Sequence, residues 1–189
     1  MTFRTLAAPL ALAASLLLGA CATPSTPVET MRDDVRGMAT SVLDRLHATE
    51  PKSRKIIAES AGYAVFTNFG LKLFLVGGGN GEGVAVERAT GRETFMKMFE
   101  LQAGLGFGAK NFDLVFVFDT KTAFDRFVES GWEFGTQATA AAQLNEVGMA
   151  HAGALSVSPG VWLYQLAGDG LALELTAKGT KYYKDDRLN

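Results

Sequence analysis

The stretch GYAVFTNFGLKLFLVGGGNGEGVAVER, residues 62–88, decides the fold, because short apolar and aromatic runs alternate there with glycines. The runs Tyr63–Phe69, Lys72–Val76 and Val84–Arg88 have the β-branched and aromatic content that is typical of strands. Glycine clusters mark turns and connections more often than strand interiors. We therefore expect Gly77–Gly83 to separate two strands.

The pattern continues on the C-terminal side of this stretch. Ala89–Arg92 is typical of a hairpin turn, which would lead into a strand at Glu93–Phe99. Short connections favour antiparallel pairing, because parallel strands need crossovers of a dozen or more residues. Further strands are expected at Leu101–Gly108, Phe112–Phe118, Gly160–Leu166, Leu171–Thr176 and Lys178–Tyr183.

Helices are expected on both sides of these strands. Apolar residues recur at spacings of three and four between Met31 and Leu46, which predicts an amphipathic helix over Thr30–His47. Pro51 favours a second helix that ends near Ser60, and Lys121–Ser130 has the pattern of a third. Trp132–Ala142 fits either a strand of small residues or an Ala-rich helix. The fold class is therefore α+β: a Gly-rich antiparallel β-sheet, curved or barrel-like, with a few packed helices.

The first twenty residues have the pattern of a secretory signal peptide. Met1–Thr5 carries one positive charge, and Leu6–Leu18 is uncharged and consists mainly of Leu and Ala. As a helix, this apolar segment would span about 20 Å, which is too short for a hydrocarbon core of about 30 Å. We expect residues 1–20 to be removed.

The sequence Leu18-Gly19-Ala20-Cys21 resembles a lipobox, in which the Cys thiol receives a diacylglycerol before cleavage. Cys21 is the single cysteine of the chain, so an internal disulfide is excluded and lipidation accounts for the thiol. An ordinary signal peptide with an incidental cysteine is the alternative. Ala22, rather than Asp, follows the cysteine, which favours the outer membrane. We expect residues 21–29 to form a flexible tether and residues 30–189 to form one domain.

The charge of the expected mature chain limits its partners. Removal of residues 1–20 takes away only Arg4 among the charged residues, which leaves 17 Lys and Arg against 20 Asp and Glu. This acidic balance argues against nucleic acid as a partner, because nucleic acid requires a clustered basic surface. Attraction to anionic lipid would have to come from a local basic patch.

Sequence motifs for catalysis and metal binding are absent. The chain has no G-x-S-x-G nucleophile motif, no H-E-x-x-H and no EF-hand spacing. His47 ends an expected helix, where a positive charge favours the dipole, and His151 lies in a Gly- and Ala-rich segment without an evident partner. The sequence therefore favours a protein that is not an enzyme and uses neither metal nor cofactor. Carboxylate pairs that are distant in sequence would escape such a search.

Two glycine-rich segments were compared with phosphate-binding loops. Gly77–Gly83 fits G-x-G-x-x-G in no register, whereas Gly104–Ala109 fits G-x-G-x-x-A. The dinucleotide fingerprint joins a strand to a helix, and both segments instead adjoin expected strands. We interpret Gly104, Gly106 and Gly108 as one bare face of a strand, which another element or a ligand can approach closely.

Four motifs, in this order, resemble the SYLF domain family, which is also called Ysc84-like. The resemblance extends over about Ala58–Tyr183. It rests on the segments Ala61–Phe69, Gly77–Val84, Leu101–Gly106 and the closing pair Val161–Leu166 and Gly170–Leu175.

The resemblance implies a lipid-binding module. Eukaryotic members bind phosphoinositides through basic residues, and some bind actin alongside an SH3 domain. In the periplasm neither actin nor phosphoinositides are expected partners. The best local basic patch here is Lys52, Arg54 and Lys55, and Lys97 and Lys110 are weaker candidates. A solvated helix face is the alternative interpretation of residues 52–55.

These features predict an outer-membrane lipoprotein, facing the periplasm, whose SYLF-like domain contacts anionic headgroups. Each basic residue near an anionic leaflet contributes about 1 kcal/mol, so three of them would support a protein that is already anchored. The alternative is a structural lipoprotein whose Phe-rich sheet docks onto another protein of the cell envelope.

Overall fold

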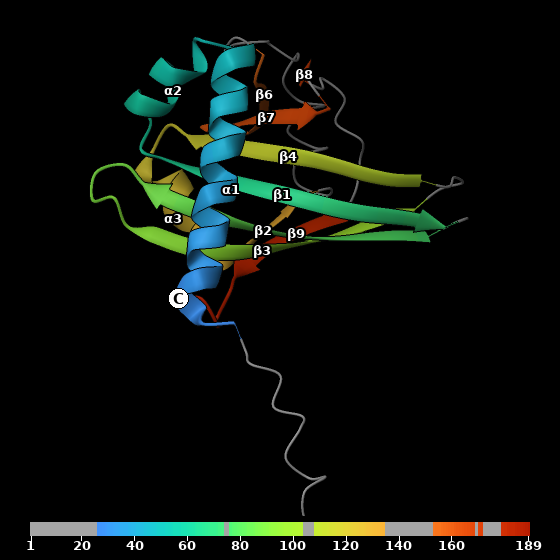
Figure 1. Cartoon of the computed structure of the whole chain (residues 1–189). Helices are drawn as coiled ribbons and strands as arrows, with labels where there is room; N and C mark the ends of the chain where they lie inside the picture. Colours follow the sequence, from blue (N-terminus) through green and yellow to red (C-terminus); the bar gives the residue numbers. More distant parts are fainter. Residues whose placement is uncertain (1–25, 74–75, 104–107, 135–152, 169, 172–178) are drawn as a thin grey trace, which may run out of the picture.

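The computed structural model describes residues 26–73, 76–103, 108–134, 153–168, 170–171 and 179–189 (Figure 1). These residues form three helices and nine strands. In chain order they are α1 (Val28–Thr49), α2 (Ser53–Glu59), β1 (Gly62–Leu73), β2 (Val76–Glu87), β3 (Glu93–Ala103), β4 (Gly108–Phe118), α3 (Lys121–Ser130), β5 (Trp132–Phe134), β6 (Leu155–Ser158), β7 (Val161–Ala167), β8 (Gly170–Leu171) and β9 (Gly179–Lys184).

All the strands belong to one antiparallel sheet. Its order is β5-β9-β3-β2-β1-β4-β7-β6, and β8 pairs with β7. The four central strands, β1 to β4, are 11 or 12 residues long and pair along almost their whole length. The predicted α+β class is confirmed.

The glycine run that was expected to separate two strands lies inside β2. Gly77–Gly83 pairs residue by residue with β1 on one side and with β3 on the other. The prediction of a connecting segment is therefore wrong. The reason is steric, because a Cβ at Gly83 would overlap the carbonyl oxygen of Val65 and the ring of Phe66. Glycine is needed here because the neighbouring strand and its side chains fill the space.

Other boundaries differ from the predictions in smaller ways. Strand β3 runs from Glu93 to Ala103 without a break. It therefore joins the strand expected at 93–99 to the first residues of the strand expected at 101–108. Trp132–Phe134 is a strand, and β6 was not predicted. The expected bare face at Gly104 and Gly106 lies outside the described residues.

The sheet curls into a half-barrel. Strands β4 and β9 are four positions apart in the sheet, which is roughly 19 Å in a flat sheet. Yet the ring of Phe116 on β4 lies 5.1 Å from that of Tyr182 on β9, and Phe66 on β1 lies 4.9 Å from Tyr182. The inner face is therefore concave and filled by aromatic side chains, as a curved or barrel-like sheet requires.

Helix α3 packs on this inner face. Its Phe127 ring lies 5.2 Å from Phe116 and 5.5 Å from Tyr182. The helix begins where the side chain of Thr120 accepts a hydrogen bond from the Ala123 amide, at 3.2 Å, and it ends before Gly131, whose φ is +65°. This local chemistry matches the predicted helix at Lys121–Ser130.

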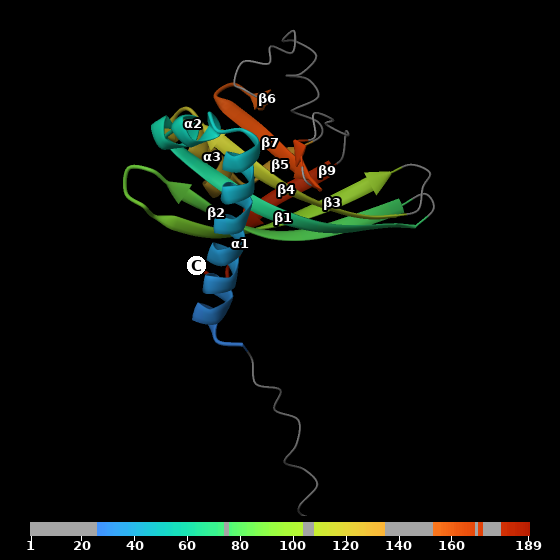
Figure 2. The same cartoon turned by 45° about the horizontal axis from the view of Figure 1, so that its top comes forward.

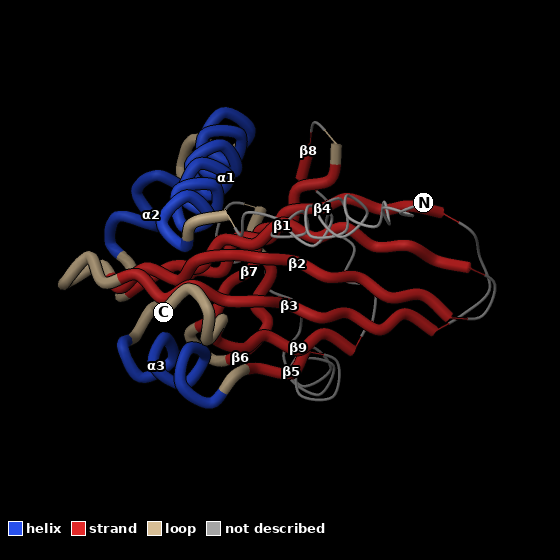
Figure 3. Tube along the Cα trace, turned by 60° about the horizontal axis from the view of Figure 1, so that its bottom comes forward, coloured by secondary structure: helices blue, strands red, loops and turns tan. Residues whose placement is uncertain are grey.

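Helices α1 and α2 cover the opposite, outer face of the sheet (Figure 3). One side of α1 buries Val35, Ala39, Val42 and Leu46. The strand residues beneath it lie on one line of the register, which runs through Phe95, Val84, Val65, Val115 and Tyr164. Helix α1 therefore crosses the sheet along this line, and β1 to β4 extend beyond it (Figures 1 and 2).

Candidate functional site

The outer face of the sheet beyond α1 is not covered by a described helix. Two residues past the line that α1 covers, Thr67, Glu82 and Lys97 lie side by side on β1, β2 and β3. Two residues further, Phe69, Asn80 and Phe99 form the next row. Because alternate strand residues point to the same face, both rows share the outer face with α1.

This face carries an exposed apolar patch, which we define as Phe69, Phe99, Leu101 and Tyr183. Their relative exposures are 55%, 39%, 55% and 39%, and they come from β1, β3 and β9. Among the described residues, Val28 is the other large apolar side chain of comparable exposure. Contiguous exposed apolar groups are uncommon on soluble proteins and mark contact with another molecule or a membrane.

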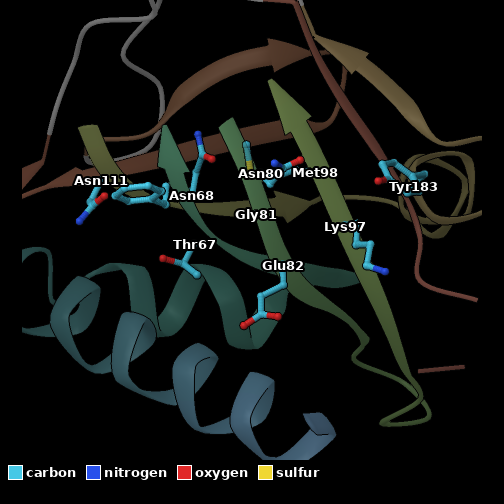
Figure 4. A pocket seen from close by; sticks show the side chains of 10 residues that line it. Thr67, Asn68, Asn80, Gly81, Glu82, Lys97, Met98, Asn111 and Tyr183 are labelled. Carbon is cyan, nitrogen blue, oxygen red and sulfur yellow. The ribbon is translucent and has the colours of Figure 1, made fainter. Parts of the chain in front are cut away.

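A shallow depression of about 560 Å³ lies beside the apolar patch (Figure 4). Its lining comes from five strands and is mostly polar or aromatic. Asn68 and Met98 of this lining are buried, and their neighbours in the strands point to the outer face. The lining residues are Thr67, Asn68, Phe69, Asn80, Gly81, Glu82, Lys97, Met98, Asn111 and Tyr183.

The two ionised side chains in this depression have different surroundings. Lys97 Nζ lies 3.0 Å from Oδ2 of Asp185, whose side chain is almost fully buried. Glu82 stands opposite Lys97 in the strand register, but no ion pair of Glu82 is found within the described ranges. Lys97 therefore already has one carboxylate partner, whereas the carboxylate of Glu82 is exposed.

The inner side of the sheet below the depression holds a buried polar pair. Asn68 Nδ2 donates a hydrogen bond of 2.9 Å to Oε2 of Glu100, and both side chains are buried. Burial, together with the charge of Glu100, raises the pKa of the neighbouring Tyr182.

The structure does not bring the five predicted lipid-binding residues together. Lys52, Arg54 and Lys55 are exposed on and beside α2, near the start of β1, and Lys55 faces Glu59 at 3.8 Å. Lys97 lies in the depression on β3, well away from α2 in the sheet. The side chain of Lys110, like Cys21 and His151, lies outside the described residues.

Sequence reasoning missed the apolar patch because its members come from three strands. A signal was present in β3, where Lys97, Phe99 and Leu101 alternate with Met98 and Glu100. This alternation predicted a half-buried strand. It could not show that Phe99 and Leu101 would lie on a part of the outer face that α1 does not cover.

A second depression, of about 480 Å³, lies where α1 begins, and it is basic. Each of its four cations contacts a carboxylate: Arg36 and Glu93 at 2.9 Å, Arg32 and Glu29 at 3.1 Å, Arg92 and Glu87 at 3.4 Å, and Lys184 and Glu129 at 3.4 Å. Hydrogen bonds to Glu29, Glu93 and Asp33 raise the pKa of Arg36. Of these contacts, the one between Arg36 and Glu93 joins α1 to the sheet, and Arg32 Nε also donates a hydrogen bond of 2.8 Å to the carbonyl oxygen of Leu188.

His47 lies 2.8 Å, through Nδ1, from the hydroxyl of Ser53. Burial, together with the charge of Arg54, lowers the pKa of His47, which opposes the positive charge expected at this helix end. The Ser53 side chain is fully buried, so its hydroxyl is not exposed to a substrate. The pair links α1 to α2.

Two searches of the described ranges gave negative results. No helix there combines the length and the apolar composition needed to cross a membrane. No three His, Cys, Asp or Glu side chains of these ranges converge as the ligands of a metal ion would.

Sequence comparison with known proteins shows which family and which relative this chain resembles. The family model described as "Ysc84: Las17-binding protein actin regulator" matches residues 99–189, which run from the end of β3 to β9 and beyond. Beta cell expansion factor A of Aeromonas veronii is 34% identical over 165 residues, or 87% of this chain. The chain spans 61% of the length of that relative. The C-terminal part of this chain, residues 99–189, is therefore similar to the Ysc84 family, also called the SYLF domain family.

Proposed function

We propose that this chain is a lipid-anchored outer-membrane protein whose SYLF domain binds the membrane surface on the periplasmic side. The observation that carries this proposal is the apolar patch, in which two Phe, one Leu and one Tyr side chain are exposed on one face. A membrane-binding surface combines apolar side chains, which contact acyl chains, with Tyr and Lys side chains, whose polar ends reach the headgroups. The proposed activity is binding, without catalysis.

The expected anchor supports lipid as the occupant of this face. Six residues, 22–27, would join the acylated Cys21 to Val28 at the start of α1. Six residues reach at most about 20 Å, so the start of α1 would stay close to the bilayer. Because α1 lies on the outer face, the apolar patch would be held near the same surface.

Positive charge next to the patch supports contact with anionic headgroups. Lys181 on β9 stands beside Phe99 in the strand register, and Lys97 stands beside Tyr183. Lys52, Arg54 and Lys55 would add attraction from α2. At about 1 kcal/mol for each residue near the surface, these charges would assist the patch and not replace it.

The proposal predicts that Phe99→Ser combined with Leu101→Ser weakens binding of residues 22–189 to phosphatidylglycerol vesicles roughly tenfold or more, because both side chains lose their apolar contact with lipid. Vesicle co-sedimentation at low salt measures this. Ala58→Ser with Ala89→Ser, at exposed sites away from the patch, is the matched control and should bind normally. Equal binding by the patch variant and the control would contradict the proposal.

A second candidate function is docking onto another envelope protein through the same patch. The description of the matching family model names a protein that binds another protein, and this supports docking as a second candidate. Crosslinking in intact cells separates the two, since a discrete protein adduct that disappears with Phe99→Ser and Leu101→Ser would support docking.

A further inference from the structure

The depression beside the apolar patch has the chemistry of a cation site. Its exposed carboxylate, Glu82, has no ion pair within the described ranges, and the one lysine in the lining contacts the carboxylate of Asp185. The other hydrogen-bonding side chains of the lining carry no charge: Thr67, Asn68, Asn80, Asn111 and Tyr183. The depression therefore has a net negative charge on a face that we expect to meet lipid.

Two aromatic side chains line the same depression as this carboxylate. Phe69 is the diagonal neighbour of Glu82 across β1 and β2, about 7–8 Å away along the backbone and within reach of a ring. Tyr183 stands two strands away in the same row, beyond Lys97. A carboxylate attracts an ammonium group, and aromatic rings in the same depression add attraction through the ring quadrupole.

Lys97 retains donors for a second, anionic group. An ammonium has three N–H donors, and Asp185 accepts from Lys97 at 3.0 Å, which leaves two donors for another acceptor. Lys97 and Glu82 face each other on neighbouring strands, so their Cβ atoms are about 5 Å apart. A ligand with a cation and an anion separated by a short linker matches this pair.

We propose that the depression at Glu82 and Lys97 binds the phosphoethanolamine headgroup of a phospholipid, with its ammonium at Glu82 and its phosphate at Lys97. Only two carbons separate the phosphate ester oxygen and the ammonium in this headgroup, which suits neighbouring strands. This inference rests on the proposed membrane contact and names a lipid class for it. The patch would insert among lipids, and the depression would select the headgroup.

The test is an NMR titration of the full chain, with its anchor held in micelles of an uncharged detergent. The probes are the soluble compounds glycerophosphoethanolamine and glycerophosphoglycerol. We expect saturable amide shifts at Glu82 and Lys97 with the first probe alone. Glu82→Gln should weaken this binding about tenfold, since it removes the charge that holds the ammonium.

Glu59→Gln, at an exposed carboxylate on α2, is the matched control and should titrate like the original chain. Equal responses to the two probes, no response to either, or an unchanged titration with Glu82→Gln would overturn the headgroup site. Phe99→Ser with Leu101→Ser should weaken vesicle binding and leave the soluble titration unchanged. Loss of vesicle binding and loss of headgroup binding are therefore separate results, and each proposal can fail alone.

Discussion

Gly83→Ala should destabilise the folded domain by about 3 kcal/mol, because the added Cβ has no space in the centre of the sheet. It would overlap the carbonyl oxygen of Val65 and the ring of Phe66. That carbonyl belongs to the β1 backbone, which pairs with both β2 and β4, so it cannot move away without disturbing two ladders. Urea unfolding, followed by circular dichroism, would show the lower transition midpoint.

Two other glycines give matched controls for this prediction. A Cβ at Gly78, in the same strand, would make an ordinary contact of 3.6 Å with the Glu100 carbonyl oxygen, so Gly78→Ala should have little effect. A Cβ at Gly37, in α1, would have nothing within 4 Å, and Gly37→Ala should stabilise the domain by about 0.5–1 kcal/mol. Similar losses for Gly83→Ala and Gly78→Ala would contradict the steric explanation.

Phe116→Ala should cost about 3–5 kcal/mol of unfolding free energy, the range for a large aromatic side chain removed from a packed core. Phe116 is fully buried, and its ring lies 5.2 Å from Phe127 and 5.1 Å from Tyr182. Its loss would leave a cavity between β4, α3 and β9, where the half-barrel closes on itself. The same unfolding measurement applies.

Phe69→Ala makes the same chemical change at an exposed position of the sheet. Its effect on stability should stay within about 0.5 kcal/mol, as for most surface substitutions. A loss at Phe69 as large as at Phe116 would mean that the apolar patch is part of the core, and it would remove the basis of the proposed membrane contact.

The sequence predicted those elements whose signals are local. The Lys121–Ser130 helix was predicted from its apolar period, and the closing β7 strand from its apolar run. The glycine run in β2 was misassigned because its cause is not local. Only the packing of β1 against it, with the Phe66 ring, makes a side chain at Gly83 impossible.

The candidate site was less accessible to sequence reasoning than the fold. Lys52, Arg54 and Lys55 were found because they are neighbours in the chain. Phe69, Leu101 and Tyr183 are distant in sequence, and only the strand register brings them to one face. Their exposure also depends on where α1 crosses the sheet, and the sequences of the strands do not predict that position.

A tryptophan placed at position 99 tests the proposed membrane contact most directly. Phe99→Trp keeps an aromatic ring in the apolar patch, and Arg88→Trp places one in the turn directly after β2 as a control. Both variants would be mixed with vesicles whose acyl chains carry bromine, which quenches tryptophan at contact. The fluorescence of the unsubstituted chain, which has two tryptophans, is subtracted. We predict strong quenching at position 99 and little at position 88. Equal quenching at both positions, or none at position 99, would contradict contact between this face and lipid.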